Sequence, residues 1–416
     1  MSRGRLYWLL AGLVVLTLGT LASASSAGAR RPRAHAAYVQ QCADPYPATR
    51  DPSNPLDLPS APGGDPLSGA GFFVDGPRHG EAAGAIEKLL GINPNRYPDG
   101  YSWARFASSL AHGKLHRKLS RNHALAHKVA LLEKLAGQPE AQRFSLYSAG
   151  GGPGAIFAQV QKIFCHNLTA DPGTIPIITT YFLYQAGYCE SSSEIIAHRP
   201  TFERQVNEMV AGIERRPAVM LLELDAIGSS SCMARSGALP QWEADIRYEI
   251  NAVASLPHAV VYIEGGYSDA NSPAYTARVL NAVGVQSIRG FYTNDTHLNW
   301  TINEVRWGDK VSALTGGSHF IVNTADNGRG PKKNPHPVTQ GNEDLCNPPG
   351  RGAGPRTTTQ TGFPAVDAFM WVHVPGSSSG KCNGGTPSGT FFLARGLTEA
   401  ANANARLGPH YPSRPY

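Results

Sequence analysis

The chain has 416 residues, of which 37 are Lys or Arg and 31 are Asp or Glu, giving a formal net charge of +6. Five of the positive charges are arginines within residues 1–33, a segment without acids, and removing these five from +6 leaves +1 for residues 34–416. A nearly neutral body lacks the basic surface that nucleic-acid binding requires, and this length suits one large barrel-type domain or two ordinary domains.

The N-terminus has the pattern of a secretory signal peptide over residues 1–29. Arg3 and Arg5 precede an apolar run over residues 6–21, and small residues suitable for cleavage lie between residues 22 and 29. The alternative is a retained membrane anchor, although the apolar run is short for a full span. We therefore expect a secreted protein without membrane association after cleavage.

Residues 30–64 are rich in Pro, Ala, Asp and Ser, which predicts a linker and a lead-in loop before the folded body. A short lead-in strand is expected within residues 65–75, and a helix over residues 105–139. The basic run at residues 114–128 carries leucines at helical spacing. We interpret it as the solvent-facing side of that helix rather than as a binding patch.

From residue 218 onward, short apolar runs alternate with amphipathic segments. The apolar runs are residues 218–225, 259–264, 287–291, 319–323 and 366–372. Helices are expected between them over residues 242–253, 275–282 and 301–315. Continuous apolar runs of this length are typical of buried parallel strands. The alternation therefore predicts an α/β fold with a parallel sheet that helices flank or close.

Polar side chains stand where these expected strands end. Glu223 and Asp225 follow one strand, Glu264 ends the next, and Asn323 and Asp326 follow a third. In barrels of this kind the carboxyl ends of the strands carry the active site. Each residue could instead cap the following helix or turn, but the clustering of acids favours a site.

Two short motifs suggest other functions, and both fit poorly. Gly150, Gly152 and Ala155 have the spacing of a dinucleotide-binding fingerprint, but the preceding strand is polar and the motif lies far from an N-terminal βαβ unit. Residues 376–380 match a nucleophile elbow, yet no helix-forming segment follows the serine. We therefore expect neither a nucleotide cofactor nor a serine hydrolase.

Six cysteines in an exported chain favour three disulfides, and the sequence alone allows about fifteen pairings. No Cys-x-x-Cys or His-Glu-x-x-His spacing occurs, so a dedicated metal site is not expected, and no other cofactor is indicated. Cys346 and Cys382 bracket a Pro/Gly-rich loop and one apolar strand, as in a disulfide-tied loop over a strand end.

Together, residues from about 65 to 390 resemble glycoside hydrolase family 6, the secreted cellulases that cut β-1,4-glucan with inversion. Glu223-Leu-Asp225 resembles the family's Glu-Pro-Asp, and Arg289-Gly-Phe291 with Thr293-Asn294 resembles its Arg-Gly-Phe-x-Thr-Asn. Two further segments, Cys346-Asn-Pro-Pro-Gly-Arg351 and Asp367-Ala-Phe-Met-Trp371-Val, are close to its C-terminal signature.

The resemblance implies a single distorted parallel β/α barrel with long disulfide-tied loops over residues 65–400, followed by a tail at residues 401–416. It also implies Asp225 as the general acid, a β-glucan substrate and a monomer. The disulfides it implies are Cys189–Cys232 and Cys346–Cys382, which leaves Cys42 and Cys165 to pair by elimination.

Several charged positions depart from the family pattern. Tyr188 stands in place of a carboxylate thought to tune the acid, and Tyr267 in place of a histidine. Asn323 occupies the position of the base, so Asp326 or Glu264 would have to act through a water. With Tyr188 uncharged, burial and the neighbouring Glu223 would have to raise the pKa of Asp225.

A further segment also departs, because His373 replaces a lysine, and Ser377 and Ser379 replace a glutamate and an aspartate. We expect substrate contacts from residues around the acid and along the last strand. They are Glu223, Tyr188, Tyr267, Asn294, Asn323, Trp371 and His373. The alternative to a rewired hydrolase is a family member that has lost catalysis and binds carbohydrate.

Overall fold

The computed structural model describes residues 64–145, 152–183, 189–331 and 345–412. By its internal contacts the chain divides into residues 1–43 and 44–416, and all of the described residues belong to the second unit. The expected signal peptide, nearly all of the linker, and Tyr188 and Cys42 lie outside the described residues, so the expectations about them remain predictions.

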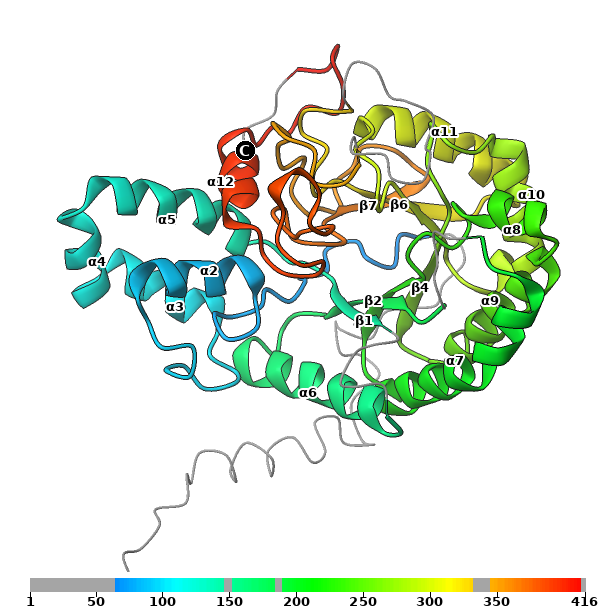
Figure 1. Ribbon diagram of the computed structural model, residues 1–416, viewed down its shortest axis with the longest axis horizontal. Coiled ribbons are helices and arrows are strands. Elements are labelled where there is room, and N and C mark those ends of the chain that lie inside the picture. The colour runs from blue at the N-terminus through cyan, green and yellow to red at the C-terminus, as the bar shows by residue number, and fades with distance from the viewer. Residues whose placement is uncertain (1–63, 146–151, 184–188, 332–344, 413–416) are drawn as a thin grey trace, which may run out of the picture. The chain divides into compact units, whose positions relative to one another are not determined.

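Seven strands form one sheet in chain order, and every neighbouring pair is parallel. The strands are β1 Gln142–Ser145, β2 Ile177–Tyr181, β3 Ala218–Leu222, β4 Ala259–Glu264, β5 Gly290–Thr293, β6 His319–Asn323 and β7 Val366–Met370. The sheet curls (Figure 1), and near β1 and β7 the N–H of Ala141 donates to the carbonyl oxygen of Trp371 at 3.2 Å. This is the distorted parallel β/α barrel that the family resemblance implied.

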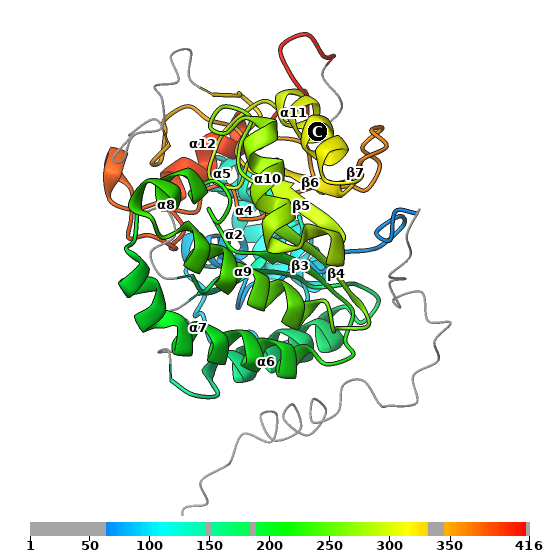
Figure 2. The same cartoon turned by 90° about the vertical axis from the view of Figure 1, so that its right-hand side faces the viewer.

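The helices fall into an outer layer and a separate group. They are α2 Glu81–Leu90, α3 Trp103–Ala111, α4 Gly113–Ser120, α5 His123–Ala136, α6 Ala155–Ala170, α7 Ser192–Ile213, α8 Ser230–Ser236, α9 Leu239–Val253, α10 Pro273–Val283, α11 Thr301–Leu314 and α12 Leu393–Ala401. Helices α6, α7, α9, α10 and α11 contact one another in succession around the outside of the sheet (Figure 2). Helices α2 to α5 form the separate group beside the sheet, and they pack with α12 (Figure 1).

The single helix expected over residues 105–139 was wrong, because three helices occupy this region. Helix α3 ends at Ala111, the following His112 has an extended backbone, and Gly113 takes a left-handed φ of 73°. Helix α5 then starts afresh behind Asn122, whose side chain accepts the Leu125 N–H at 3.0 Å. The leucines still point inward and the basic side chains outward, as the periodicity predicted.

The core has one layer inside the barrel and one between sheet and helices. Alternate strand residues fill the interior, among them Val219, Leu221, Tyr262, Tyr292 and Met370. Their neighbours in sequence, such as Met220, Ile263 and Phe291, pack outward against the helices. Because side chains alternate along a strand, a strand that is apolar throughout must be covered on both faces.

The signature residues Arg289 and Asp367 belong to the fold rather than to the strand-end site. They form a two-bonded ion pair of 2.7 and 2.9 Å, and Tyr262 and His319 also contact Asp367 at 2.7 and 2.9 Å. The adjoining Gly290 has no room for a Cβ, which would overlap the His319 carbonyl group. The Arg-Gly-Phe motif therefore fixes β5 between its neighbours.

Two of the expected disulfides are confirmed. Cys189 bonds Cys232 and Cys346 bonds Cys382, with Cα–Cα distances of 5.1 and 6.0 Å. The start of the expected tail is part of the folded body, since Leu407 is buried and its carbonyl oxygen accepts the N–H of Ile302 at 2.8 Å. No helix in the described ranges is long and apolar enough to cross a bilayer.

Candidate active site

Side chains that follow several strands meet at the carboxyl-terminal edge of the sheet, as the sequence predicted. After β4, the Tyr267 hydroxyl donates to the carboxylate of Asp225, which follows β3. After β7, His373 Nε2 lies 2.9 Å from Oδ2 of Asp326, which follows β6. Residues far apart in the sequence are therefore joined into one polar region.

Asp225 is held by two hydroxyl groups that end on the same oxygen. Thr296 Oγ1 donates to Asp225 Oδ1 at 2.8 Å, and the Tyr267 hydroxyl donates to that oxygen too. Asp225 is only partly buried. Both bonds therefore orient the carboxyl group while its second oxygen, Oδ2, is left for another contact.

The pKa of Asp225 lies above its ordinary value. Burial is the largest cause, the hydrogen bonds from Tyr267 and Thr296 oppose it, and the negative charge of Asp295 adds to the rise. From the sequence we expected Glu223 to supply the neighbouring charge, whereas Asp295 supplies it here. A raised pKa is what a carboxyl group needs if it is to donate a proton near neutral pH.

A stacked pair of rings supports Tyr267. The Tyr267 and His297 rings lie parallel, with centroids 3.7 Å apart and an interplanar angle of 4°. His297 Nδ1 in turn lies 2.8 Å from Asp269 Oδ1, which also accepts a hydrogen bond from Asn299 at 2.7 Å. The Tyr267 phenol is thus held rigidly against Asp225.

The backbone at the end of β3 is strained. Glu223 and Asp225 have φ angles of 53° and 59°, a left-handed region that residues with a Cβ seldom adopt. Such conformations cluster at functional sites, because surrounding contacts must maintain them. Here Glu223 supplies part of that restraint, since its carboxylate accepts the N–H groups of Phe182 and Leu183 at 2.9 Å each.

Glu223 is therefore a structural residue rather than the substrate contact that the sequence suggested. It is fully buried, and its backbone N–H donates to Thr180 Oγ1 at 2.9 Å. Strand-end acids satisfy the backbone of the neighbouring strand in this way when their side chains turn back toward the sheet.

Asn294 and Asn323 also serve the fold, so their assignment to substrate binding needs correction. Both are buried. The Asn323 side chain donates to the Asn294 carbonyl oxygen at 3.0 Å, and the Asn294 side chain donates to the Asn323 carbonyl oxygen at 3.0 Å. These reciprocal hydrogen bonds join the ends of β5 and β6, and they engage the side-chain NH2 groups of both asparagines within the fold.

Trp371 is likewise part of the core. Its side chain is buried, with 1% of its surface exposed, and its indole N–H donates to the Pro355 carbonyl oxygen at 3.0 Å. A tryptophan that stacks on a sugar must present an open ring face, so the sequence-based assignment of Trp371 to substrate binding does not hold.

The two residues suggested as bases are both engaged. Glu264 is fully buried and accepts the N–H groups of Gly228 and Gly266 at 3.0 and 2.5 Å. Asp326 Oδ2 contacts His373 Nε2 at 2.9 Å and Arg395 Nη2 at 2.5 Å. Among the described residues Asp326 Oδ1 has no hydrogen-bond partner, but it is buried, so neither carboxylate presents an exposed oxygen to water.

The Asp326 group is an ion-pair network. Burial alone would raise the pKa of Asp326, but the charges of Arg395 and His373 hold that pKa below its ordinary value. Burial would lower the pKa of His373, yet Asp326 and Asp295 raise it to about 9. His373 is therefore a cation near neutral pH.

Sequence reasoning missed Asp295, Thr296 and Arg395. Asp295 is buried, and its Oδ1 lies 3.8 Å from both Arg143 Nη2 and His373 Nδ1. Asp295 and Thr296 follow β5 directly, so their position after an apolar strand was a usable signal. Arg395 lies on α12, far along the chain, and no local pattern marks it.

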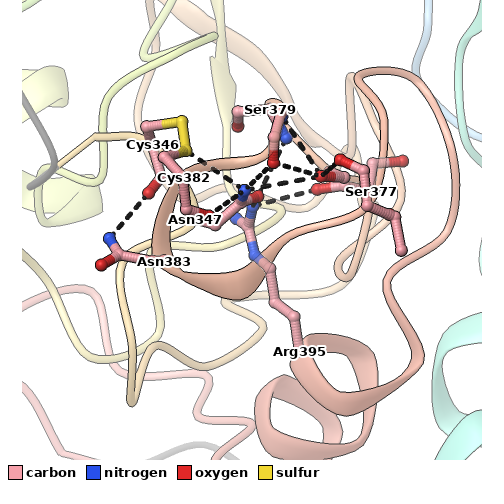
Figure 3. The surroundings of a disulfide bond; sticks show 10 residues. Cys346, Asn347, Ser377, Ser379, Cys382, Asn383 and Arg395 are labelled. Carbon is pink, nitrogen blue, oxygen red and sulfur yellow. Dashed lines mark hydrogen bonds between the residues drawn. A yellow bond between two sulfur atoms is a disulfide. The ribbon is translucent and has the colours of Figure 1, made fainter. Parts of the chain in front are cut away.

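The loop tied by Cys346–Cys382 is organised by one amide, that of Asn347 (Figure 3). Its Nδ2 donates to the Gly380 carbonyl oxygen at 2.7 Å, and its Oδ1 accepts from Ser379 N and Arg395 Nη1 at 2.9 and 3.0 Å. This loop also carries Ser377, whose hydroxyl donates to Glu81 Oε2 at 2.5 Å. Glu81 opens helix α2.

The comparisons with known proteins agree on one family. The model of glycosyl hydrolases family 6 matches residues 167–411, more than half of the chain. Endoglucanase A of Cellulomonas fimi is 29% identical over 274 residues, which cover 66% of this chain and 56% of that protein. Endoglucanase 1 of Streptomyces sp. (strain KSM-9) is 29% identical over 272 residues, covering 65% and 71%. The chain thus spans little more than half the length of the first of these relatives.

Solved structures show the same fold. The endoglucanase Cel6 from Mycobacterium tuberculosis, determined with a thio-linked cellobioside derivative, aligns with a TM-score of 0.63 and 24% identity, covering 82% of this chain and 99% of that one. Endoglucanase CEL6B from Humicola insolens aligns with a TM-score of 0.58 and 17% identity, covering 82% and 99%. These structures share the fold, and the family model over residues 167–411 shows that the chain belongs to glycosyl hydrolases family 6.

Proposed function

We propose that the chain hydrolyses β-1,4-glucan, with inversion at the anomeric carbon and with Asp225 as the general acid. The observation that carries the proposal is the setting of Asp225. It is the partly exposed carboxyl group after β3, with a raised pKa, a strained backbone and one oxygen fixed by two hydroxyl donors. The endoglucanase names of the relatives support the substrate class.

In this reaction Asp225 donates its proton to the glycosidic oxygen as the bond to the anomeric carbon breaks. Because the hydroxyls of Tyr267 and Thr296 both end on Oδ1, the proton of the neutral acid belongs on Oδ2. The same two donors then stabilise the carboxylate that remains after proton transfer. A water molecule attacks from the opposite face of the sugar and needs a base of its own.

We propose further that the protein is exported and acts outside the cell on a glucan polymer or oligosaccharide, as a monomer. The N-terminal pattern of residues 1–29 and the cysteine content support export.

The test is to incubate the purified protein with β-1,4-linked gluco-oligosaccharides and to follow products by chromatography, with Asp225→Asn as the comparison. We expect wild-type product with an α-configured new reducing end, seen by NMR at early times, and at least a 1,000-fold slower reaction in the variant at an unchanged melting temperature. Equal turnover by both proteins would end the assignment of Asp225.

A second candidate function is carbohydrate binding without catalysis. It is favoured by the state of Glu264 and Asp326, which are both occupied by hydrogen bonds or ion pairs. This function predicts saturable binding of cello-oligosaccharides, measured by calorimetry, with no product from the wild-type protein after prolonged incubation.

A further inference from the structure

The proposed reaction requires a carboxylate that can accept a proton from the attacking water, and this inference rests on that proposed function. Such a group must be reachable by water and must lie across the carboxyl-terminal edge from Asp225. Each described carboxylate near this edge can be judged by its burial and its partners.

Four of these carboxylates are closed to water. Glu223 and Glu264 are fully buried, Asp295 is 1% exposed and Asp326 is 4% exposed. Glu223 and Glu264 accept backbone N–H groups, and Asp326 is paired with two cations. Asp269 is more open, but it is bonded to His297, the residue stacked on Tyr267, and therefore lies on the flank of Asp225.

Glu81 differs from the four buried carboxylates because it is partly exposed, and from Asp269 because it lies away from His297 and Tyr267. It reaches the site from the first turn of α2 rather than from a strand end. Its Oε2 accepts the Ser377 hydroxyl at 2.5 Å, in the loop after β7. The positive charges of Arg143 on β1 and His373 after β7 both act on its carboxylate.

The hydrogen bond from Ser377, together with the nearby charges of Arg143 and His373, puts Glu81 on the β7–β1 flank, whereas Asp225 follows β3. Helix α2 contacts α5, and α5 contacts α12, in the group that stands apart from α7 to α11 in Figure 1. A sugar bound over the edge would therefore have Asp225 and Glu81 on different sides. Inverting hydrolysis needs two carboxyl groups on opposite faces of the ring, with room for a water beside one of them.

We infer that Glu81 is the general base of this reaction. The water oxygen forms its bond to the anomeric carbon while a proton of that water passes to Glu81. The bond from the anomeric carbon to the leaving oxygen breaks with its electron pair on that oxygen, which takes the proton of Asp225. Glu81 ends protonated and Asp225 ionised, and exchange with solvent restores both.

The surroundings of Glu81 suit this role. Burial raises the pKa of Glu81, while the Ser377 hydroxyl and the charges of Arg143 and His373 oppose that rise. Glu140, which is buried nearby, is itself affected by the charge of Glu81. Ser377 fixes one oxygen of Glu81, as Tyr267 and Thr296 fix one oxygen of Asp225.

An acid in the first turn of a helix is often there only to balance the helix dipole. The experiment therefore needs a readout that a structural role would not give. Azide provides it, because this anion attacks an anomeric carbon without losing a proton and fits in the space left by a removed carboxylate. The product would be a glycosyl azide of inverted configuration, with the Asp225 proton on the leaving sugar.

We would measure kcat on a cello-oligosaccharide for the wild-type protein, Glu81→Ala and Glu81→Gln, with Glu243→Gln on the outer helix α9 as the control. Both Glu81 variants should lose about 100- to 10,000-fold in kcat while the control keeps wild-type turnover. Adding azide should restore turnover of Glu81→Ala and yield the α-glycosyl azide.

Retention of more than a tenth of the wild-type kcat by both Glu81 variants would overturn the inference, as would a loss in folded Glu81→Ala that azide does not rescue. Either result would leave the proposed hydrolysis standing, since the wild-type protein would still be active. A wild-type protein that forms no product would instead refute the proposed function, and with it the base assignment.

Discussion

At the scale of single residues, what matters is which oxygen of each carboxyl group is occupied. Asp225 and Glu81 each have one oxygen tied by hydroxyl donors, whereas the carboxylates of Glu223 and Glu264 are taken up by backbone N–H groups. Residue type and position after a strand were visible in the sequence. The direction in which each side chain turns was not, because that depends on the neighbouring strand.

Replacing Tyr267 by Phe should move the alkaline limb of the pH profile. The Tyr267 hydroxyl donates to Asp225 and lowers its pKa, so removing it should raise that pKa and keep the acid protonated to higher pH. A hydrogen bond to a charged group is worth about 1.5–3 kcal/mol, which corresponds to a shift of roughly one pH unit or more.

The measurement is kcat/KM of Tyr267→Phe against pH, with Tyr248→Phe as a matched control. Tyr248 lies on α9 and donates to Asn207, away from the strand ends. A profile of Tyr267→Phe that superimposes on the wild type would show that the phenol does not set the acidity of Asp225.

At the scale of elements, the loop closed by Cys346–Cys382 carries Ser377 to Glu81. The disulfide joins residues 36 positions apart in the sequence. Without it the unfolded chain gains conformational entropy, which favours unfolding by about 3–4 kcal/mol. Replacing both cysteines by Ala should therefore lower the free energy of unfolding by about that amount and also reduce kcat.

The natural comparison is the Cys189–Cys232 pair, which closes a similar separation of 43 residues. Its removal should cost about the same stability in denaturant titrations. If the two double variants lost stability equally but the Cys346–Cys382 variant kept full kcat, the loop would have no part in positioning Glu81.

At the scale of the whole molecule, buried titratable groups predict how stability varies with pH. The negative charges of Asp326 and Asp295 raise the pKa of His373 to about 9 despite its burial. Burial raises the pKa of Glu87 and Glu190 to about 7. All three groups bind protons more tightly in the folded chain than in the unfolded chain. Their contribution to the stability of the fold is therefore present at low pH and is lost as the pH rises through these pKa values.

Asp326 acts in the opposite direction. Its pKa is lowered in the fold, so its contribution is present above the ordinary value of 3.8 and is lost as the pH falls through the lowered pKa. We therefore expect the melting temperature to be highest at mildly acid pH, near 5, and to decline between pH 6 and 9. Calorimetry across this range checks it, and His373→Gln should flatten the decline above pH 7; a rising curve there would contradict the prediction.

The sequence by itself determined an α/β fold with a parallel sheet, because continuous apolar runs specify buried parallel strands. The barrel and two disulfides followed only from the family resemblance, which short signatures such as Asp367 to Trp371 carried. Strand β2 was not predicted, because Thr179 and Thr180 interrupt its apolar run with polar side chains. In the structure both threonines are buried.

Only the tertiary structure decided which polar residues are accessible. Trp371, Asn294 and Asn323 looked like ligand contacts but are buried among backbone partners, while Glu81 and Ser377, 296 positions apart, are brought together by the fold. The physical reason is that burial and hydrogen bonding depend on neighbours in space. A sequence pattern can mark a strand end, but it does not show which groups the next strand and the disulfide-tied loop bring against it.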